Sequence, residues 1–419
     1  MLATVFAFVD KQILVVVVEP MKHDLALRDI QIGELQGLAP ALFAILAVFP
    51  LAWLADRFER SKVLLGCALF WSMATAACAF ADGFAMLLAC RIAVAVGEAA
   101  LVPIVYSLIP DLFSGQSRIR ANLLFFGASV LGIGLGLTLA GAALGFVESI
   151  RPALPEGLNG LAGWRLAFLA VALPGPPIAL AIALIGTTRR TVAQAEGPGR
   201  THVLDYLRAH RQTVVGVYLS GGFSTFVAFA LFAWLPSAIV RAFNGAPETV
   251  GASFGMAYVA GSVVGLGLAA VTASFWRRWA GTAAVPRARA VTSLLAIIPM
   301  LLIGVSASAS QAYILIVVLV ALVTTGAALS PTMLQDMAPP AIRARIISGV
   351  AITSAILGGI GPVAVGALSD AVAGHPRGLM WAIVTIATIG FLFCALCYRL
   401  VETPLRRTVA ALEGTESEG

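Results

Sequence analysis

The sequence predicts an all-α membrane protein with twelve transmembrane helices arranged in two pseudo-symmetric six-helix halves. Of its 419 residues, 60% are hydrophobic and only 11% are charged, whereas charged residues make up about a quarter of an ordinary soluble chain. A transmembrane helix needs roughly 20 apolar residues, so the length accommodates about twelve spans and no soluble domain of useful size. Lipid must therefore cover most of the exterior.

Twelve apolar blocks, separated by polar or Gly/Pro-rich breaks, are the predicted helices. They cover residues 1–21, 32–55, 62–81, 84–110, 121–147 and 164–186 in the first half, and 213–240, 248–276, 290–307, 310–335, 344–370 and 378–400 in the second. The predicted organisation is an N-terminal bundle (1–186), a cytoplasmic linker (187–212), a C-terminal bundle (213–401) and a cytoplasmic tail (402–419). We expect a surface helix within the linker, around Leu204 to His210.

The distribution of basic residues predicts the orientation of the chain. Nineteen of the 27 Lys and Arg residues fall in loops on one side and six on the other, while Lys11 and Arg91 lie inside helices. Because basic loops stay cytoplasmic, we expect both termini in the cytoplasm and the protein in the inner (plasma) membrane. The basic residues are scattered between apolar blocks, which argues against nucleic acid as a partner. Asp10 and Lys11 interrupt the first apolar run, which argues against a cleaved signal peptide.

Charged groups inside the predicted spans are concentrated in the first half. Asp10 lies in the first helix, and Arg91 and Glu98 are seven residues apart in the fourth, so they project from one face of it. A charge at the bilayer centre costs at least about 3 kcal/mol and needs a reason. An arginine between two carboxylates is suited to proton exchange. We expect Asp10 and Glu98 to couple protons and Arg91 to balance them or to bind an anionic substrate group; the alternative is a structural ion-pair network.

Motifs for metal or nucleotide chemistry are missing from the sequence. It contains neither H-E-x-x-H nor G-x-x-x-x-G-K-[ST], its four histidines fall in predicted loops, and its five cysteines all lie in apolar stretches. We therefore expect no metal, no cofactor and no enzymatic activity, and keep a membrane-embedded enzyme as a distant alternative. Glycine-rich stretches, such as the one from Gly127 to Gly145, predict close helix packing.

The six-plus-six pattern resembles the major facilitator superfamily. The segment PLAWLADRFERSK, after the second block, is similar to the loop signature of that family, although Pro50 or Leu51 replaces its first glycine. In the family, the acidic residue of this loop pairs near the eleventh helix and closes the cytoplasmic side. The conformational gate that the resemblance implies consists of Asp56, Arg57, Arg60, Lys62, Arg343 and Arg345.

Three further stretches resemble the spinster-like branch, including its bacterial members. They are FVDKQILVVVVEPMKHDLALRDIQIGELQG, RIAVAVGEAALVPIVYSLIPDLF and GWRLAFLAVALPGPP, and they place Asp10, Arg91 and Glu98 at matching positions. The resemblance implies a monomeric, proton-coupled transporter that moves an amphipathic lipid-like substrate, a lysolipid or a sphingoid phosphate, by alternating access. The organic-anion branch has partly similar patterns, so transport of small organic anions or drugs is the alternative.

Overall fold

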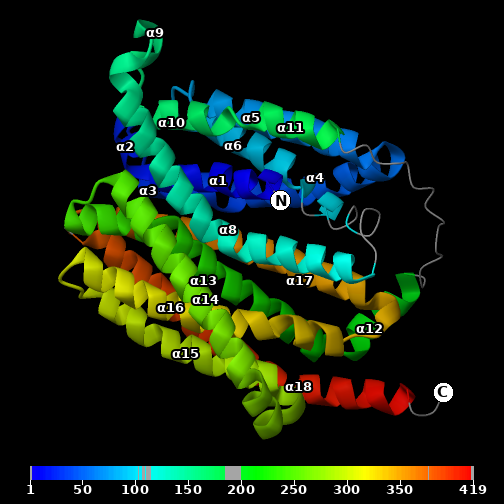
Figure 1. The fold of residues 1–419 in the computed structure, drawn as a ribbon. Helices are drawn as coiled ribbons and strands as arrows, with labels where there is room; N and C mark the ends of the chain where they lie inside the picture. Colours follow the sequence, from blue (N-terminus) through cyan, green and yellow to red (C-terminus); the bar gives the residue numbers. More distant parts are fainter. Residues whose placement is uncertain are drawn as a thin grey trace. The chain divides into compact units, whose positions relative to one another are not determined.

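The structure, a computed structural model, describes residues 2–416 apart from 102, 106–108, 110–114, 185–199 and 376. The described residues form helices and their connections (Figure 1). The helices of the first part are α1 (Leu2–Val16), α2 (Val18–Asp24), α3 (Asp29–Gln36), α4 (Leu38–Arg57), α5 (Arg60–Cys78), α6 (Phe84–Glu98), α8 (Gly115–Ile150), α9 (Glu156–Asn159), α10 (Gly163–Ala172) and α11 (Gly175–Leu184). They continue with α12 (Arg200–Ala209), α13 (Arg211–Phe243), α14 (Pro247–Ala280), α15 (Ala284–Gly304), α16 (Ala309–Asp336), α17 (Pro340–Ala371) and α18 (Gly378–Glu416).

The predicted all-α membrane fold is confirmed. Among the described residues, eleven helical segments are long and apolar enough to cross a bilayer, and they correspond to the second to twelfth predicted blocks. The first block is divided between α1 and α2, and α1 alone has 15 residues. The helix predicted within the linker is also confirmed, as α12. Residues 185–199 of the predicted linker lie outside the described part.

Glycine and proline explain where two of the predicted spans are interrupted. Gly37 separates α3 from α4 with a backbone conformation (φ −114°, ψ −116°) that is not helical. Pro40 then lies in the first turn of α4, where its missing N–H leaves no hydrogen bond unmade. The α10–α11 break falls at the segment LPGPP, because each proline removes a donor and restricts the residue before it.

The chain forms two compact units. Unit 1 comprises Met1–Ala193, Phe232–Val259 and Pro362–Met380, and unit 2 comprises Gln194–Leu231, Ala260–Gly361 and Trp381–Gly419. The chain passes from one unit to the other inside α13, α14, α17 and α18. The division into an N-terminal and a C-terminal bundle stays a prediction.

In unit 1, helices pack closely through glycines, as the sequence predicted. A Cβ on Gly136 of α8 would lie 2.9 Å from the carbonyl oxygen of Phe8 in α1. A Cβ on Gly255 of α14 would lie 2.5 Å from the carbonyl oxygen of Gly134 in α8. Both distances are shorter than real Cβ contacts, so α8 approaches α1 and α14 only because these positions lack side chains.

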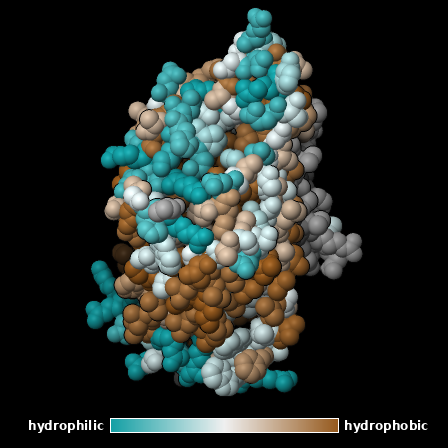
Figure 2. Space-filling model, turned by 90° about the vertical axis from the view of Figure 1, so that its left-hand side faces the viewer, coloured by the Kyte–Doolittle hydropathy of each residue, from teal (hydrophilic) through white to brown (hydrophobic). Residues whose placement is uncertain are grey.

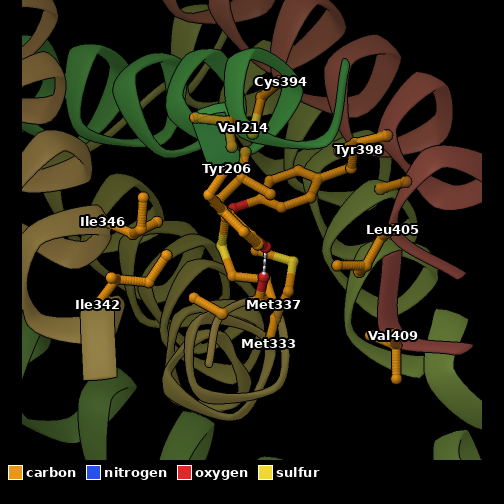
Figure 3. Packing of buried hydrophobic residues seen from close by; sticks show 14 of the residues in the cluster. Tyr206, Val214, Met333, Met337, Ile342, Ile346, Cys394, Tyr398, Leu405 and Val409 are labelled. Carbon is orange, nitrogen blue, oxygen red and sulfur yellow. Dashed lines mark hydrogen bonds between the residues drawn. The ribbon is translucent and has the colours of Figure 1, made fainter. Parts of the chain in front are cut away.

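In unit 2, α12 completes an apolar core. Tyr206 of α12 is 9% exposed, and its hydroxyl donates to the carbonyl oxygen of Met337 at the end of α16 (Figure 3). Burial raises the pKa of Tyr206 to about 12. Side chains of α13, α16, α17 and α18 surround the ring. They include Val214, Met333, Ile342, Ile346, Tyr398 and Leu405.

Large apolar side chains are exposed on both units. Phe49 of unit 1 is 67% exposed and Val271 of unit 2 is 76% exposed. In contrast, polar groups such as Asp10 and Arg289 are buried. Figure 2 shows the molecule from the side that lies at the left in Figure 1. On this face, hydrophilic residues gather next to hydrophobic ones. Apolar exteriors with polar interiors are the arrangement that lipid, not water, stabilises.

Candidate functional site

Asp10 lies inside unit 1 and is held by a neighbouring helix. Asp10 is on α1, and the residue is only 4% exposed. The hydroxyl of Thr75 on α5 lies 2.7 Å from both carboxylate oxygens and donates to them. Within the described part of the chain this is the one hydroxyl that donates to Asp10, and it leaves most of the acceptor capacity of the carboxylate unused. Lys11, the next residue, is exposed.

Arg91 and Glu98 lie on α6, seven residues apart and therefore on one face. Arg91 is 7% exposed, and its Nε and Nη1 atoms are buried without a hydrogen-bond partner among the described residues. The Oε1 atom of Glu98 is in the same condition. Asp10 interacts electrostatically with Arg91, and Glu98 with both of them. The structure therefore brings the three predicted residues into one buried cluster, whose role stays a prediction.

Gly97 explains how α6 reaches this position. A Cβ on Gly97 would lie 2.8 Å from the Cβ of Trp71 and 3.1 Å from its backbone nitrogen. Any larger residue would therefore push α6 away from α5. Thr75 follows Trp71 by one helical turn, and Glu98 follows Gly97 directly. This close approach of α6 to α5 therefore brings Glu98 to the same side of the bundle as Thr75.

The predicted gate residues lie at helix ends. Of their side chains, that of Asp56 lies outside the described residues. Arg57 is exposed and stacks over Trp53 at 5.3 Å, and Lys62 pairs with half-buried Glu59 at 3.1 Å. Arg60 is the first residue of α5, Arg345 is exposed on α17, and Arg343 donates to the carbonyl oxygen of Ala338 at 3.2 Å. The first four belong to unit 1 and Arg343 and Arg345 to unit 2, so their pairing stays a prediction.

A second charged cluster in unit 1 was not predicted. Arg241 of α13 donates from Nε to Glu19 of α2 at 2.9 Å. Its two terminal nitrogens donate to the carboxylate of Asp29 on α3, both at 2.7 Å. Lys22 also pairs with Asp29. The bidentate geometry is the strongest form of arginine–carboxylate pairing, so this cluster joins α2 and α3 firmly to α13.

The end of α17 completes this cluster. The carboxylate of Asp370 accepts the backbone N–H groups of Asp29 and Ile30, both at 3.0 Å, and so caps the first turn of α3. The hydroxyl of Ser369 donates to Asp29 at 2.7 Å. Beside these groups lies a cavity of about 320 Å³. Its polar lining includes Lys22, Asp29, Arg241, Ser369, Asp370 and Arg377.

We call Glu19, Lys22, Asp29, Arg241, Ser369 and Asp370 the α3 lock. Its members come from four helices, and those on α2 and α3 are more than 200 residues from their partners on α13 and α17. Each member lies near a helix end, where charged residues are common. The only signal in the sequence is that charges of both signs occur at these ends, which does not specify a pairing.

The GWR motif of the third stretch also has a structural explanation. The indole nitrogen of Trp164 donates to Asp24 at 3.0 Å. Arg165 donates to the same carboxylate at 3.3 Å and to the carbonyl oxygen of Ala79 at 2.9 Å. The start of α10 is thereby tied to the ends of α2 and α5. Within the described part of the chain, no three His, Cys, Asp or Glu side chains gather closely enough to hold a metal ion.

Residues 1–335 match the sequence profile of the Major Facilitator Superfamily. The chain belongs to this superfamily. It is therefore a transporter and not an enzyme, and it is a multi-pass membrane protein. The chain is 25% identical to an MFS-type efflux pump of Mycolicibacterium smegmatis, over 96% of this chain and 91% of that protein.

Superfamily members of the spinster type are also similar to this chain. It is 28% identical to the mouse sphingosine-1-phosphate transporter SPNS2, over 88% of this chain and 68% of that protein. A crystal structure of a bacterial homologue of the human lysosomal transporter Spinster, in an inward-facing and unoccupied conformation, superposes with a TM-score of 0.83. That comparison covers 97% of this chain and 96% of the other at 22% identity, and it supports the fold. The predicted resemblance to spinster-like transporters is confirmed.

Proposed function

We propose that this transporter couples proton movement to alternating access for an amphipathic, lipid-like substrate, a lysolipid or a sphingoid phosphate. We further propose that it acts as a monomer in the inner membrane. Both termini then lie in the cytoplasm, because the basic residues are concentrated in alternate loops and such loops stay cytoplasmic. The buried cluster of Asp10, Arg91 and Glu98 carries the proposal, because ionisable groups are retained at membrane depth chiefly for function.

The unused hydrogen-bonding capacity of this cluster supports binding of a proton and of a substrate. Two nitrogens of Arg91 and one oxygen of Glu98 are buried without a hydrogen bond in the described structure. Such groups are costly to leave unpaired. An anionic headgroup on Arg91 and a proton on Glu98 each supply the missing partner.

The proposed cycle follows from charge balance. With Asp10 and Glu98 ionised, Arg91 has two carboxylates to balance it. Protonation removes that negative charge, so that Arg91 accepts an anionic headgroup instead. A bound species drives the change in access only to the extent that it favours one conformation over the other. In the proposed cycle, the α3 lock and the predicted gate around Asp56 close the transport path alternately at opposite ends.

The substrate class rests on similarity together with this chemistry. SPNS2 is a sphingosine-1-phosphate transporter by name, and an arginine in an apolar setting suits a phosphate with a long tail. The efflux pump from Mycolicibacterium smegmatis is similar over most of the chain and supports the alternative, transport of small organic anions or drugs. A substrate screen distinguishes the two classes.

The first prediction tests proton coupling. In liposomes with an imposed pH gradient, we expect Asp10→Asn and Glu98→Gln each to lower gradient-driven transport of a sphingoid phosphate or lysolipid by more than about tenfold. The reason is that each neutral mimic removes one of the two proposed proton carriers and one of the two carboxylates that balance Arg91, and removing a partner from a buried charged cluster costs several kcal/mol. Binding of the substrate in the absence of a gradient persists.

Controls make this test specific. Asp205→Asn changes an exposed carboxylate of α12, and Glu156→Gln changes an exposed one of α9; both variants should transport like the parent. Arg91→Ala should lose binding of anionic substrates with or without a gradient. Gradient-driven transport that survives both Asp10→Asn and Glu98→Gln rules out the proposed carriers. Transport of a sugar acid or a cationic dye, with no transport of lipids, favours the alternative substrate class.

A further inference from the structure

At one end of unit 2, three arginines surround a single buried carboxylate. Glu402 of α18 is 9% exposed. Arg287 of α15 donates to its Oε1 atom from Nε at 2.9 Å, while Arg399 and Arg406 of α18 approach its two oxygens at 3.1 and 3.2 Å. Among the described residues, it is the only carboxylate within ion-pair distance of these arginines. One negative charge therefore balances three positive charges.

The excess positive charge is accessible. The side chains of Arg399 and Arg406 are 62% and 45% exposed. Arg407 follows directly on α18, and Arg277 and Arg278 lie in the last turn of α14; all three are exposed. An anion at this end of the unit therefore meets guanidinium groups that a single carboxylate does not neutralise.

Aromatic rings stand beside these arginines. Phe275, Trp276 and Trp279 of α14 pack on one another, with ring centroids 5.6 to 6.3 Å apart. Phe275 and Trp279 are nevertheless 58% and 60% exposed. The guanidinium of Arg287 lies 5.2 Å above the ring of Trp279, which links the aromatic cluster to Glu402. Exposed tryptophans next to basic groups are typical of the membrane–water interface.

Exposed apolar side chains continue from the aromatic rings along the same helices. Val271 on α14 is 76% exposed, and Leu396 and Leu400 on α18 are 51% and 67% exposed. Hydrocarbon is the medium that such side chains favour. A molecule that contacts both the arginines and these residues must therefore have a charged head and apolar chains.

We propose that Arg287, Arg399, Arg406 and Trp279 form a binding site for the phosphate headgroup of an anionic phospholipid. The arginines bind the phosphate, the tryptophan ring lies at the level of the glycerol backbone, and the acyl chains lie along the exposed apolar residues of α14 and α18. A free phosphate ion makes no use of the exposed rings or of the apolar residues beside them. The site shares no residue with the cluster of Asp10, Arg91 and Glu98 and does not depend on the proposed substrate.

Native mass spectrometry of the full chain tests this site. The protein is reconstituted into vesicles of phosphatidylcholine with and without phosphatidylglycerol, and the retained lipid is then measured. We expect the parent to retain phosphatidylglycerol selectively. The double variant Arg399→Gln/Arg406→Gln should lower this affinity by at least about tenfold, since it removes two of the charges that attract an anionic headgroup.

The matched control is Arg208→Gln/Arg211→Gln, which removes two exposed arginines from α12 and α13 of the same unit. This variant should retain phosphatidylglycerol like the parent. Trp279→Leu keeps every charge and should also weaken retention. Equal retention by the parent and by Arg399→Gln/Arg406→Gln overturns the proposal. So does equal retention of phosphatidylcholine, or complete displacement of the lipid by inorganic phosphate, which assigns the arginines to small anions instead.

Discussion

A single hydrogen atom in place of a side chain sets the spacing of two helices in unit 1. Gly255 of α14 faces the backbone of α8, and its added Cβ would also lie 2.7 Å from the nitrogen of Thr138. Gly267, three turns further along the same helix, has no neighbouring atom within 4 Å of its added Cβ. Glycine is therefore required for close helix packing at position 255, whereas position 267 has room for a side chain.

Alanine substitution at these two glycines gives the second prediction. Gly255→Ala should lower the thermal unfolding midpoint in detergent, because overpacking typically costs about 1–3 kcal/mol. Gly267→Ala should leave it unchanged or raise it, since alanine favours the helix by up to about 1 kcal/mol over glycine. Equal midpoints for the two variants would mean that α8 moves aside at little cost.

At the scale of elements, α12 is stabilised more by tertiary contacts of its aromatic and hydroxyl groups than by the intrinsic helix propensity of its residues. The helix has ten residues, which is too short for stability in isolation. Tyr206 anchors it in the core of unit 2, and His210, just beyond its end, packs on the Tyr206 ring at a centroid distance of 4.5 Å. His210 also shares a hydrogen bond of 3.1 Å with Thr408 of α18. The linker helix is therefore fixed to the last helix of the chain.

The third prediction concerns pH. Burial lowers the pKa of His210 below its usual value of 6.5. The unfolded chain thus binds more protons than the folded one between the two values. The stability that neutral His210 contributes is complete above about pH 6.5 and is lost as the pH falls through the lower folded value.

Thermal unfolding at neutral and at mildly acidic pH checks this prediction. Acidification should lower the midpoint of His210→Gln less than that of the parent. His23→Gln, which changes an exposed histidine at the end of α2, should respond to acid like the parent. An identical acid response of His210→Gln and the parent contradicts the assignment.

At the scale of the whole molecule, unit 1 combines segments from both halves of the sequence. Phe232–Val259 and Pro362–Met380 belong to the second half, yet they pack with the first 193 residues. The α3 lock is the polar part of this packing, and the indole nitrogen of Trp234 adds a hydrogen bond of 2.9 Å to the carbonyl oxygen of Pro362. Breaking the lock should therefore separate second-half segments from α2 and α3.

Cysteine labelling provides the fourth prediction. Ala238 lines the cavity beside the lock and is 1% exposed. In an Ala238→Cys background, Arg241→Gln should raise the rate of labelling by a membrane-impermeant maleimide by more than about tenfold. The reason is that Glu19 and Asp29 lose their shared counter-charge, which costs roughly 3–5 kcal/mol for a buried pair. Arg151→Gln breaks an ion pair with exposed Glu148 and hydrogen bonds to the carbonyl oxygens of Asn159 and Leu161, none of them part of the lock. This variant should leave the rate unchanged, and a similar rate in both variants would exclude a closing role for the lock.

Much of the fold and part of the candidate site follow from the sequence alone. Apolar blocks of span length predict the helices because lipid requires each backbone to satisfy its own hydrogen bonds. The spacing of Arg91 and Glu98 predicts their common face because helical periodicity is local. Asp10 is identified as unusual by its cost in hydrocarbon, wherever its neighbours lie.

The tertiary structure decided which distant residues meet. No periodicity relates Thr75 to Asp10, Arg241 to Asp29, or Glu402 to Arg287, because pairing across helices depends on their rotation and spacing. Glycines such as Gly97 and Gly255 set that spacing through contacts that do not exist in an isolated helix. The sequence determined which side chains are too polar for lipid, and packing determined the partner of each, since a buried charge is stabilised only by the groups that surround it.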